Sequence, residues 1–384
     1  MIIEIRQAGF VNKGAELMLH AVVQKLRERY PEAKLTMAPD YGGADDTFEK
    51  MRALNLYPKA WFFRRGFDFG RLASFIPKKL LKQYGLVVTK EIDVVIDAAG
   101  FAYSDQWGDA VSAELARSSA VWKKNGTKLI LLPQALGPFK ESNIRKHVMS
   151  WTKNADLIFA RERDSFKYLI DLVGNKDKIK VCSDFTNLVE GTLPQGYDSS
   201  NKRIALVPNY RMIDKTFGEE SEAYLPFMIR CAQYLVSNGQ KPFVLVHEGD
   251  NDMKLAVSIS DAVGGIPILK ETNPLHIKGI LGTCDSTIGS RFHGLVSALS
   301  QGVPSLATGW SHKYARLFED YGFMDGIVDV LDDEEVLHRK IDILINSDTS
   351  VALKQKLNKK SAVLKLASEQ MWEVVFSEID AKSH

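Results

Sequence analysis

Cysteine is scarce in this chain, and the signatures of metal and redox proteins are missing. Its three cysteines, Cys182, Cys231 and Cys284, are scattered and form no CxxC pair. That spacing favours small buried thiols in a reducing compartment over a metal or redox role. The sequence also has no HExxH motif, no Cys/His cluster and no clean Asp-x-Asp at the end of an expected strand. We therefore expect a protein that needs no metal and no bound cofactor.

Long apolar runs and an excess of one charge are missing as well. No apolar run reaches the ~20 residues that span a bilayer, and residues 1–6 are too short and too charged for a signal peptide. The formal net charge is +2, whereas dedicated nucleic-acid binders usually show a strong basic excess. We expect a cytoplasmic protein that binds no nucleic acid.

The sequence does contain a regular alternation of short apolar runs with longer helical patterns, which indicates an α/β architecture with parallel sheets. Helical patterns such as residues 14–30, 112–125 and 223–238 each end near a Gly, Pro or Asn stop signal. The expected strands are residues 2–5, 34–37, 93–97, 128–132, 157–160, 180–182, 203–207, 242–247, 266–269, 286–288 and 305–307.

A segment of linker composition divides this pattern into two similar halves. Residues 191–201 are rich in Gly, Pro, Ser and Asn, and 384 residues are enough for two domains. We therefore predict two Rossmann-like domains facing across a cleft, at residues 1–195 and 202–348. A C-terminal helix within residues 350–384 is expected to cross back and pack on the first domain.

The stretch from Thr287 to Pro304 is the most informative part of the chain. It is typical of a strand, a tight Gly-Ser loop, a helix, a Gly turn and the next strand. The first turn of a helix has unpaired N–H groups and a partial positive charge, so Arg291 at that point predicts an anion site. A lone histidine is more often structural, but His293 shares this junction with Arg291 and can titrate near neutral pH. We predict catalytic roles for His293 and Arg291, and anion binding by Ser290, Arg291 and Gly294.

Further basic residues follow other strands. His312 and Lys313 come after the next strand and are expected to enter the same cleft, which suits an anionic small molecule. Arg161 and Arg163 lie at another strand-to-helix junction and are also assigned to the anion. The alternative for these two is an ordinary charged helix start.

Polar side chains follow the strands of the first half, where a parallel sheet binds its ligands. Their chemistry suits the hydroxyl groups of a sugar. The alternatives are that Asn12 and Glu16 only cap a helix, and that Asp105 lies in a solvated turn. The residues assigned to this second substrate are Asn12, Glu16, Asp97, Tyr103, Asp105 and Gln134.

Residues 59–82 interleave aromatic and basic side chains, with Asp68 as the single acidic residue. Such a composition fits contact with anionic lipid headgroups through the segment Trp61–Lys82. The alternative is a helical hairpin whose aromatic residues are core and whose basic residues are solvated.

Together these motifs resemble the polysaccharide pyruvyl transferases. Residues 290–294, followed by 302–304 and Lys313, are similar to the family's Ser-Arg-x-His…Gly-x-Pro…Lys pattern. Residues 12–16 resemble its Gly-Asn-x-Gly-Asp-Glu loop, although Val11 replaces the glycine and Ala15 the aspartate. Other similar segments are Asp97–Gly100, Gln134, Gly137–Phe139, Arg161–Ser165 and Asp184.

The resemblance implies a GT-B-like fold and a transferase that forms pyruvate ketals on surface glycans, in capsule or exopolysaccharide biosynthesis. Phosphoenolpyruvate would be the co-substrate on the second domain, and a sugar diol the acceptor on the first. A lipid-linked acceptor would place the protein at the inner face of the cell membrane, as a peripheral protein. The main alternative is a GT-B glycosyltransferase or epimerase that uses a nucleotide sugar; a scaffold without enzymatic activity is the third.

Overall fold

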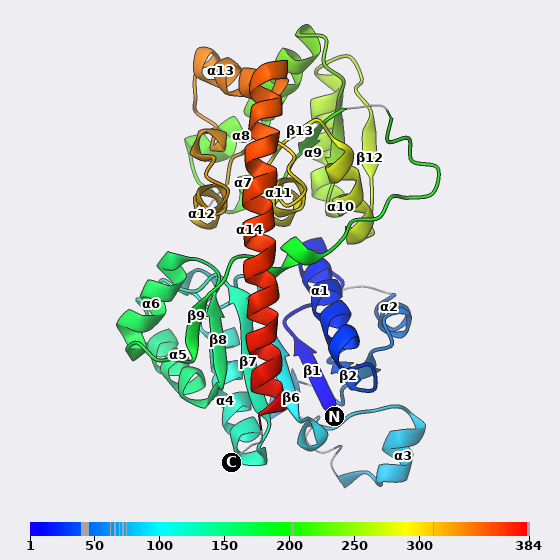
Figure 1. Cartoon of the computed structure of the whole chain (residues 1–384), viewed down its shortest axis with the longest axis vertical. Coiled ribbons are helices and arrows are strands. Elements are labelled where there is room, and N and C mark those ends of the chain that lie inside the picture. The colour runs from blue at the N-terminus through cyan, green and yellow to red at the C-terminus, as the bar shows by residue number, and fades with distance from the viewer. Residues whose placement is uncertain are drawn as a thin grey trace. The chain divides into compact units, whose positions relative to one another are not determined.

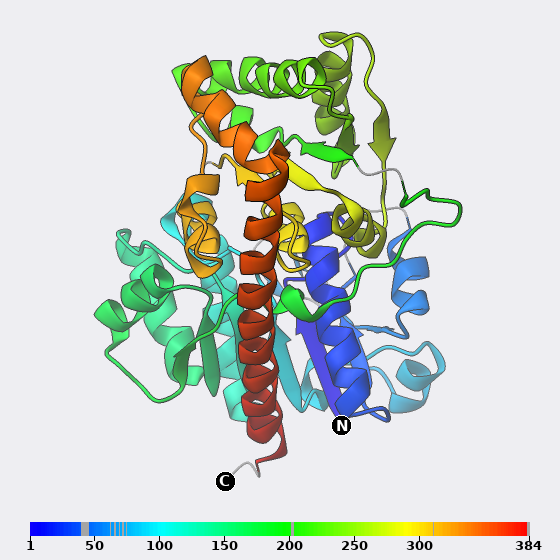
Figure 2. The ribbon, with the colours of Figure 1, turned by 45° about the horizontal axis from the view of Figure 1, so that its top comes forward.

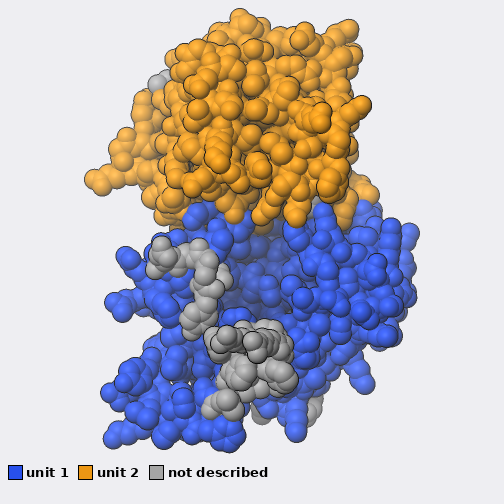
Figure 3. All heavy atoms as spheres, turned by 180° about the vertical axis from the view of Figure 1, so that it is seen from behind, with its two compact units in different colours: residues 1–185, 367–384 blue, residues 186–366 orange. Residues whose placement is uncertain are grey.

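The chain folds into two compact units, coloured separately in Figure 3. The computed structural model describes residues 1–39, 46–61, 63–64, 67–68, 70, 73, 75–200, 203–309 and 311–381. Unit 1 consists of Met1–Phe185 and Ala367–His384, and unit 2 of Thr186–Leu366.

Unit 1 is built on a seven-stranded parallel sheet with the order β3-β2-β1-β6-β7-β8-β9. In β1, Glu4 pairs with Thr36 of β2 on one side and with Val95 of β6 on the other. The strand order therefore reverses beside β1, and ligands of such sheets bind at the loops that leave this point. The strands are β1 (Ile2–Arg6), β2 (Lys34–Met37), β3 (Tyr57–Pro58), β6 (Val94–Asp97), β7 (Lys128–Gln134), β8 (Leu157–Ala160) and β9 (Ile179–Val181).

The helices of unit 1 connect these strands. Because successive strands are added on opposite sides of β1, right-handed crossovers put α1 and α4 on opposite faces of the sheet. Asn12 begins α1, and its side chain accepts a hydrogen bond from the Ala15 backbone N–H at 3.0 Å. The helices are α1 (Lys13–Arg29), α2 (Thr47–Ala53), α3 (Lys78–Gln83), α4 (Ala110–Asn125), α5 (Ser142–Asn154) and α6 (Arg163–Val173); β4 (Phe63–Arg64) and β5 (Phe67–Asp68) form a small antiparallel pair.

Unit 2 contains a five-stranded parallel sheet with the order β12-β11-β10-β13-β14. Leu206 of β10 pairs with Val244 of β11 and with Ile288 of β13, so β10 is the strand at which the order reverses. The strands are β10 (Ile204–Val207), β11 (Pro242–Val246), β12 (Ile268–Lys270), β13 (Ser286–Gly289) and β14 (Ser305–Ala307). The α/β architecture with two Rossmann-like domains is thus confirmed.

Apolar faces of the unit 2 helices bury against this sheet. Tyr224, Phe227 and Met228 of α8 are fully buried in one core cluster with Leu206 and Val244. The helices are α7 (Arg211–Asp214), α8 (Glu219–Ser237), α9 (Gly249–Asp261), α10 (Pro274–Thr283), α11 (Phe292–Leu299), α12 (Lys313–Asp320) and α13 (Glu334–Ile345). Short 3-10 turns occur at Thr89–Glu91, Asp105–Trp107, Phe185–Leu188 and Met324–Gly326.

The last helix, α14 (Ser347–Asp380), crosses from unit 2 into unit 1. Leu353 and Leu357, near its start, are buried in a core cluster of unit 2. Its later turns lie beside α1 in both ribbon views (Figures 1 and 2), where Lys25 Nζ is 2.9 Å from a carboxylate oxygen of Glu369. The sequence predicted that residues 350–384 pack on the first domain, but residues up to Leu366 belong to unit 2.

The boundary between the units also differs from the predicted one at residue 195. Unit 2 begins at Thr186, and residues 186–195 are held there by backbone contacts. Thr192 N–H donates to the Leu275 carbonyl at 3.0 Å, and a Cβ atom on Gly191 or Gly279 would overlap the backbone of the facing segment. Linker composition did not reveal this close approach.

The three cysteines are free thiols and buried. Burial raises the pKa of Cys231 and of Cys284 to about 12, so both are protonated and unreactive at neutral pH. Among the described residues, no helix is both long enough and apolar enough to cross a membrane.

The predicted lipid-contact segment Trp61–Lys82 is only partly described: residues 62, 65, 66, 69, 71, 72 and 74 lie outside the described residues. In and next to its described part, four large apolar side chains are exposed. They are Phe75, with 85% of its surface accessible, Ile76, Leu80 and Tyr84.

Candidate functional site

The motif expected to bind an anion lies at the carboxyl edge of the unit 2 sheet. Gly289 ends β13, and Arg291 is the N-terminal cap of α11 with extended backbone angles. Ser290, between them, is fully buried: its hydroxyl accepts a hydrogen bond from Tyr224 at 2.9 Å, and its carbonyl accepts one from Asn209 at 2.7 Å. Since Asn209 follows β10, the two loops of the switch point are joined by this hydrogen bond.

Arg291 is held by two carboxylates of unit 2. Its Nε lies 3.0 Å from Oδ2 of Asp252, and a second nitrogen pairs with Glu248. The Asp252 side chain is 1% exposed and that of Glu248 23%. Burial raises the pKa of Asp252, although Arg291 opposes the shift. Arg291 therefore lies at a helix start, as the sequence predicted, and pairs with two carboxylates that the sequence did not predict.

His293 lies in the first turn of α11, partly exposed, with its ring 5.4 Å from that of Phe292 in an edge-on arrangement. Gly294 follows it, and a Cβ there would lie 3.7 Å from the ring of His247. His247 comes directly after β11 and is buried. The structure thus brings a second histidine to the site, which sequence reasoning missed; its position after a buried strand was the available signal.

His312 and Lys313 form the start of α12. Lys313 Nζ lies 5.1 Å from the centre of the Phe292 ring, and the Tyr314 hydroxyl donates to the Ser290 carbonyl at 2.8 Å. The structure therefore places Lys313 next to Phe292, the first residue of α11.

In unit 1, three of the predicted sugar ligands form a buried hydrogen-bonded group. The Tyr103 hydroxyl donates to Asp97 Oδ2 at 2.7 Å, and Gln134 Nε2 reaches Asp97 Oδ1 at 3.5 Å. All three side chains are fully buried. Burial raises the pKa of Asp97 and of Tyr103, and Arg6 opposes the shift in each. These side chains therefore bond to one another inside unit 1 and are not exposed at the edge of the sheet.

The other three sugar-binding predictions lie on loops and helix starts. Asn12 caps α1, and Glu16 forms an ion pair with Lys13 at 2.7 Å. Asp105 accepts hydrogen bonds from the backbone N–H groups of Lys140 and Glu141 at 2.7 and 3.2 Å. Asn12 thus caps its helix, as in the structural alternative considered for it, whereas Asp105 is partly buried and ties two loops together instead of lying in a solvated turn.

The two arginines at the start of α6 have different surroundings. Arg161 is buried and lies 3.3 Å from Asp184, whereas Arg163 is exposed. Glu162 caps the helix by accepting from the Asp164 N–H at 2.7 Å. Both arginines belong to unit 1 and Arg291 to unit 2.

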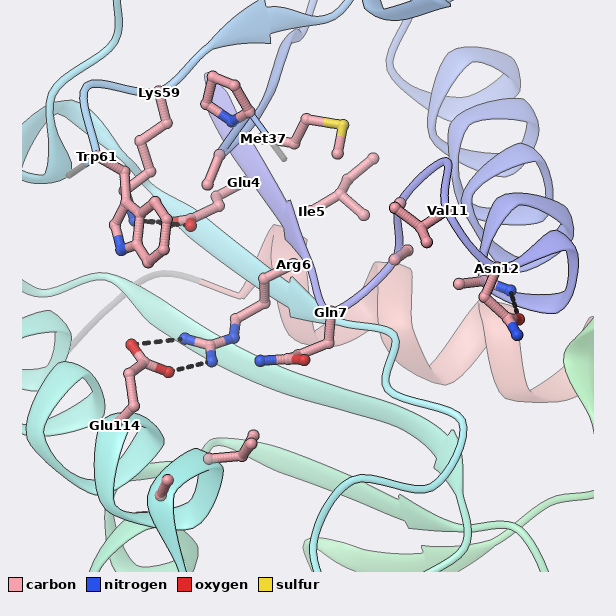
Figure 4. A pocket seen from close by; sticks show the side chains of 17 residues that line it. Glu4, Ile5, Arg6, Gln7, Val11, Asn12, Met37, Lys59, Trp61 and Glu114 are labelled. Carbon is pink, nitrogen blue, oxygen red and sulfur yellow. Dashed lines mark hydrogen bonds and ion pairs between the residues drawn. The ribbon is translucent and has the colours of Figure 1, made fainter. Parts of the chain in front are cut away.

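A pocket of about 530 Å³ opens in unit 1 beyond the ends of β1 and β2 (Figure 4). Arg6, the last residue of β1, joins two carboxylates here: its Nε lies 3.0 Å from Asp97 Oδ2, and its other nitrogens pair with Glu114 of α4. Burial opposes the charge of Arg6, but Glu114, Tyr103 and Asp97 outweigh it and raise the pKa. The lining residues are Glu4, Ile5, Arg6, Gln7, Ala8, Gly9, Val11, Asn12, Ala15, Met37, Ala38, Pro39, Lys59, Trp61, Ala110, Val111 and Glu114.

Of the polar residues that line this pocket, only Asn12 was predicted from the sequence as a binding residue. A charged residue, Arg6, at the end of an otherwise buried strand was the signal that could have indicated the pocket. Among the described residues, no cluster of three or more His, Cys, Asp or Glu side chains is arranged to hold a metal ion.

The fold is that of the GT-B-like enzymes. HepE from Anabaena, solved with UDP-glucose, is 13% identical with a TM-score of 0.58, over 98% of this chain and 99% of HepE. UDP-GlcNAc 2-epimerase from Neisseria meningitidis is 10% identical with a TM-score of 0.61, over 98% and 99%. A putative UDP-N-acetylglucosamine 2-epimerase from Listeria monocytogenes is 12% identical with a TM-score of 0.60, over 100% and 97%. At such identities the likeness concerns the fold alone.

The family follows from a match along most of the sequence. The family model described as polysaccharide pyruvyl transferase matches residues 12–312, which include the Arg291 motif and most of both sheets. This chain belongs to the polysaccharide pyruvyl transferase family.

Proposed function

We propose that this protein transfers the pyruvyl group of phosphoenolpyruvate to a sugar diol and forms a pyruvate ketal, in surface or capsular polysaccharide biosynthesis. Family membership supports the transferase class. The observation that carries the proposal is the Ser290-Arg291-Phe292-His293 start of α11, with Lys313 beside it. It combines fixed positive charge with a titratable imidazole at the carboxyl edge of a parallel sheet.

The donor carries a phosphate and a carboxylate, so it needs several cationic or N–H groups. Arg291, Lys313 and the first N–H groups of α11 supply them. Because Glu248 is the more exposed partner of Arg291, the donor takes its place on the guanidinium, while the buried Asp252 keeps the arginine in position. Arg161 and Arg163 stay secondary candidates.

The chemistry has two additions to the same carbon. One sugar hydroxyl forms a bond to C2 of phosphoenolpyruvate while C3 takes a proton, which leaves a tetrahedral C2 that still bears phosphate. The C2–O bond to phosphate then breaks, phosphate leaves, and the second hydroxyl bonds to C2 and loses its proton. His293 donates the proton to C3 and accepts protons from the hydroxyls, since imidazole serves both directions near neutral pH.

No metal or bound cofactor enters this scheme, because arginine, lysine and the helix start neutralise the donor. We expect phosphate release to be the same with and without EDTA. Loss of activity in EDTA that Mg²⁺ or Mn²⁺ restores would contradict this part of the proposal.

The acceptor is a glycan, and a lipid-linked form would bring the protein to the inner face of the cell membrane. Phe75, Leu80 and Tyr84 are exposed beside Lys78 and Lys79 at α3, which supports such contact. Replacing Lys78 and Lys79 by Glu should abolish sedimentation with vesicles that contain anionic lipid. Unchanged sedimentation would leave these residues as an ordinary solvated surface.

The test of the function is release of inorganic phosphate from phosphoenolpyruvate, with and without galactose-, glucose- and mannose-containing acceptors. We expect release only with a suitable acceptor, and a glycan product heavier by one pyruvate ketal. The alternative is a nucleotide-sugar reaction, because HepE and the epimerase from Neisseria meningitidis, which share this fold, were solved with UDP-sugars. Thermal stabilisation by UDP-sugars but not by phosphoenolpyruvate would favour it.

A further inference from the structure

The cations of the unit 1 pocket are already paired with carboxylates. Arg6 and Lys59 line the pocket with Glu4 and Glu114, and a third carboxylate, Asp97, pairs with Arg6 from beneath. Lys59 Nζ lies 2.6 Å from Glu4 Oε1, and both residues are buried, so this pair is neutral as a unit. An anion such as phosphoenolpyruvate would meet more carboxylates than cations here. These charges therefore disfavour an anion and leave an uncharged ligand as the better fit.

The polar groups of the pocket are held in place before any ligand arrives. The Glu114 carboxylate is fixed by Arg6 and by the Ser118 hydroxyl, which donates to it at 2.6 Å. Its side chain is still 24% exposed, so it has room to accept further hydrogen bonds. Carboxylates fixed in this way bind pairs of hydroxyl groups with little loss of side-chain entropy.

Gln7 occupies the switch point between β1 and β6 in an unusual conformation. Its φ is 59°, the left-handed region that favours glycine. A glutamine there costs free energy, and such outliers gather at binding sites. Figure 4 shows its side-chain amide beside the Arg6 guanidinium, at the pocket. An amide offers both a donor and an acceptor, as neighbouring sugar hydroxyls require.

An aromatic wall completes the site. The Trp61 indole lines the pocket near Lys59 and Glu4 (Figure 4), and the remaining lining is mostly aliphatic, including Ile5, Val11 and Met37. The C–H face of a sugar ring is apolar while its rim carries hydroxyls, so an indole suits the face and the carboxylate and amide suit the rim. The volume of about 530 Å³ falls in the ordinary range for small-molecule sites.

We propose that this pocket binds one neutral hexose ring of the acceptor, with Trp61 against its face and Glu114, Arg6 and Gln7 on its hydroxyls. That the bound sugar is the acceptor rests on the proposed function, whereas the binding of a neutral sugar by this pocket does not depend on it. It moves the sugar contacts from Asp97, Tyr103 and Gln134, which are fully buried, to the residues that line the pocket.

The test measures sugar binding without phosphoenolpyruvate, so that it is independent of the transfer reaction. Methyl galactoside, methyl glucoside and methyl mannoside are titrated into the full chain by saturation-transfer NMR, with Trp61→Ala and Glu114→Gln as variants. Matched controls are Trp107→Ala, at an exposed tryptophan of unit 1 outside the pocket, and Glu28→Gln on the surface of α1. We expect at least one glycoside to bind the wild type and both controls, and to bind each pocket variant about tenfold more weakly or worse.

Two further measurements distinguish a loss of sugar binding from misfolding of the variants and from failure of the proposed pyruvyl transfer. Trp61→Phe should recover part of the sugar affinity that Trp61→Ala loses, which a folding defect would not do. Thermal stabilisation by phosphoenolpyruvate should be the same in all the variants, because Arg291 lies in the other unit.

Glycoside binding that is equal in wild type and both pocket variants would overturn the proposal, as would no glycoside binding by the wild type. Glycoside binding that depends on Trp61, in a protein that never releases phosphate from phosphoenolpyruvate, would remove the pyruvyl transfer and keep the sugar site.

Discussion

Arg291 Nε lies 3.0 Å from Oδ2 of Asp252, a carboxylate whose side chain is almost fully buried. The same aspartate accepts a hydrogen bond from the Tyr210 backbone N–H at 2.9 Å through its other oxygen. Asp252 of α9 therefore joins the loop after β10 to the start of α11, whereas Glu248 touches the arginine from the solvent side.

The two carboxylates should respond differently to neutralisation. Asp252→Asn should lower the free energy of unfolding by about 3 kcal/mol, because the charge of Arg291 loses its buried partner. Glu248→Gln should leave stability nearly unchanged and lower the KM for phosphoenolpyruvate several-fold, because one repelling charge is removed. Urea unfolding and phosphate-release kinetics measure the two effects; equal behaviour of the variants would show that Glu248 is not the displaceable partner.

Arg291→Lys should lower kcat/KM for phosphoenolpyruvate by about 30-fold or more. A lysine is a single point charge and cannot hold Asp252 and an incoming anion side by side as a guanidinium does. The exposed Arg316, paired with Glu319 at 2.7 Å, gives the matched control Arg316→Lys. Similar kinetics for both variants would remove Arg291 from donor binding.

His293→Ala should lower kcat by more than about 100-fold, because the C3 proton and the hydroxyl protons lose their carrier. The fold should be kept, since His293 is partly exposed at the helix surface. His276→Ala on α10, where His276 lies 3.2 Å from Glu271, controls for removal of an imidazole. An active and folded His293→Ala protein would exclude the assigned role.

Asp97 and Glu114 should have opposite effects on how the stability of unit 1 changes with pH. Burial raises the pKa of Asp97, with Arg6 and Tyr103 opposing the shift. Burial also acts to raise the pKa of Glu114, but the Arg6 charge and its hydrogen bond outweigh burial and lower it. As the pH rises above about 4, the ordinary pKa of a carboxyl group, Asp97 ionises at a cost to the stability of unit 1. As the pH falls below about 4, Glu114 is protonated and its contribution to the stability of unit 1 is lost.

Relative to wild type, Asp97→Asn should therefore gain stability as pH rises above about 4, and Glu114→Gln should lose stability as pH rises toward about 4. Tryptophan fluorescence during urea unfolding reports mainly on unit 1, since every tryptophan except Trp310 belongs to it. The same sign of slope in both variants would contradict the different surroundings assigned to the two carboxylates.

Gly279→Ala should destabilise unit 2 by about 2 kcal/mol, because the new Cβ would overlap the Thr192 carbonyl and neither backbone can easily retreat. Gly239→Ala is the control: its φ of 69° costs about 1 kcal/mol, but the space around it is open. Calorimetry should therefore show the larger loss for Gly279→Ala. The reverse order would mean that the segment 186–195 does not pack on α10 as described.

The secondary structure and the anion motif could be predicted because their causes are local. Strands such as β2 and β8 and the position of Arg291 at a helix start follow from apolar runs and turn residues next to them in sequence. The partners of Arg291 could not be predicted, because Glu248 and Asp252 lie at the start of α9, after β11, about 40 residues earlier in the chain. In the sheet, β10 separates β11 from β13.

The sugar-binding residues show the limit of reasoning from strand ends. Asp97 and Gln134 do end strands, as expected, but a residue at a strand end can turn toward the sheet interior as readily as toward the surface. Here Asp97 is fully buried and pairs with Arg6 of the adjacent strand. Arg6 belongs to the neighbouring strand, so the choice depends on pairing between β1 and β6, which the local sequence does not contain.

The pairing of the cations with carboxylates around the unit 1 pocket has a consequence for the effect of ionic strength. Mobile ions weaken attraction between separated charges, and they act little on the binding of a ligand without net charge. If phosphoenolpyruvate binds at Arg291 and Lys313 and the acceptor glycan in the unit 1 pocket, as proposed, added salt should raise the half-saturating concentration of phosphoenolpyruvate and leave that of the glycan almost unchanged. The response to salt would then assign each substrate to a unit.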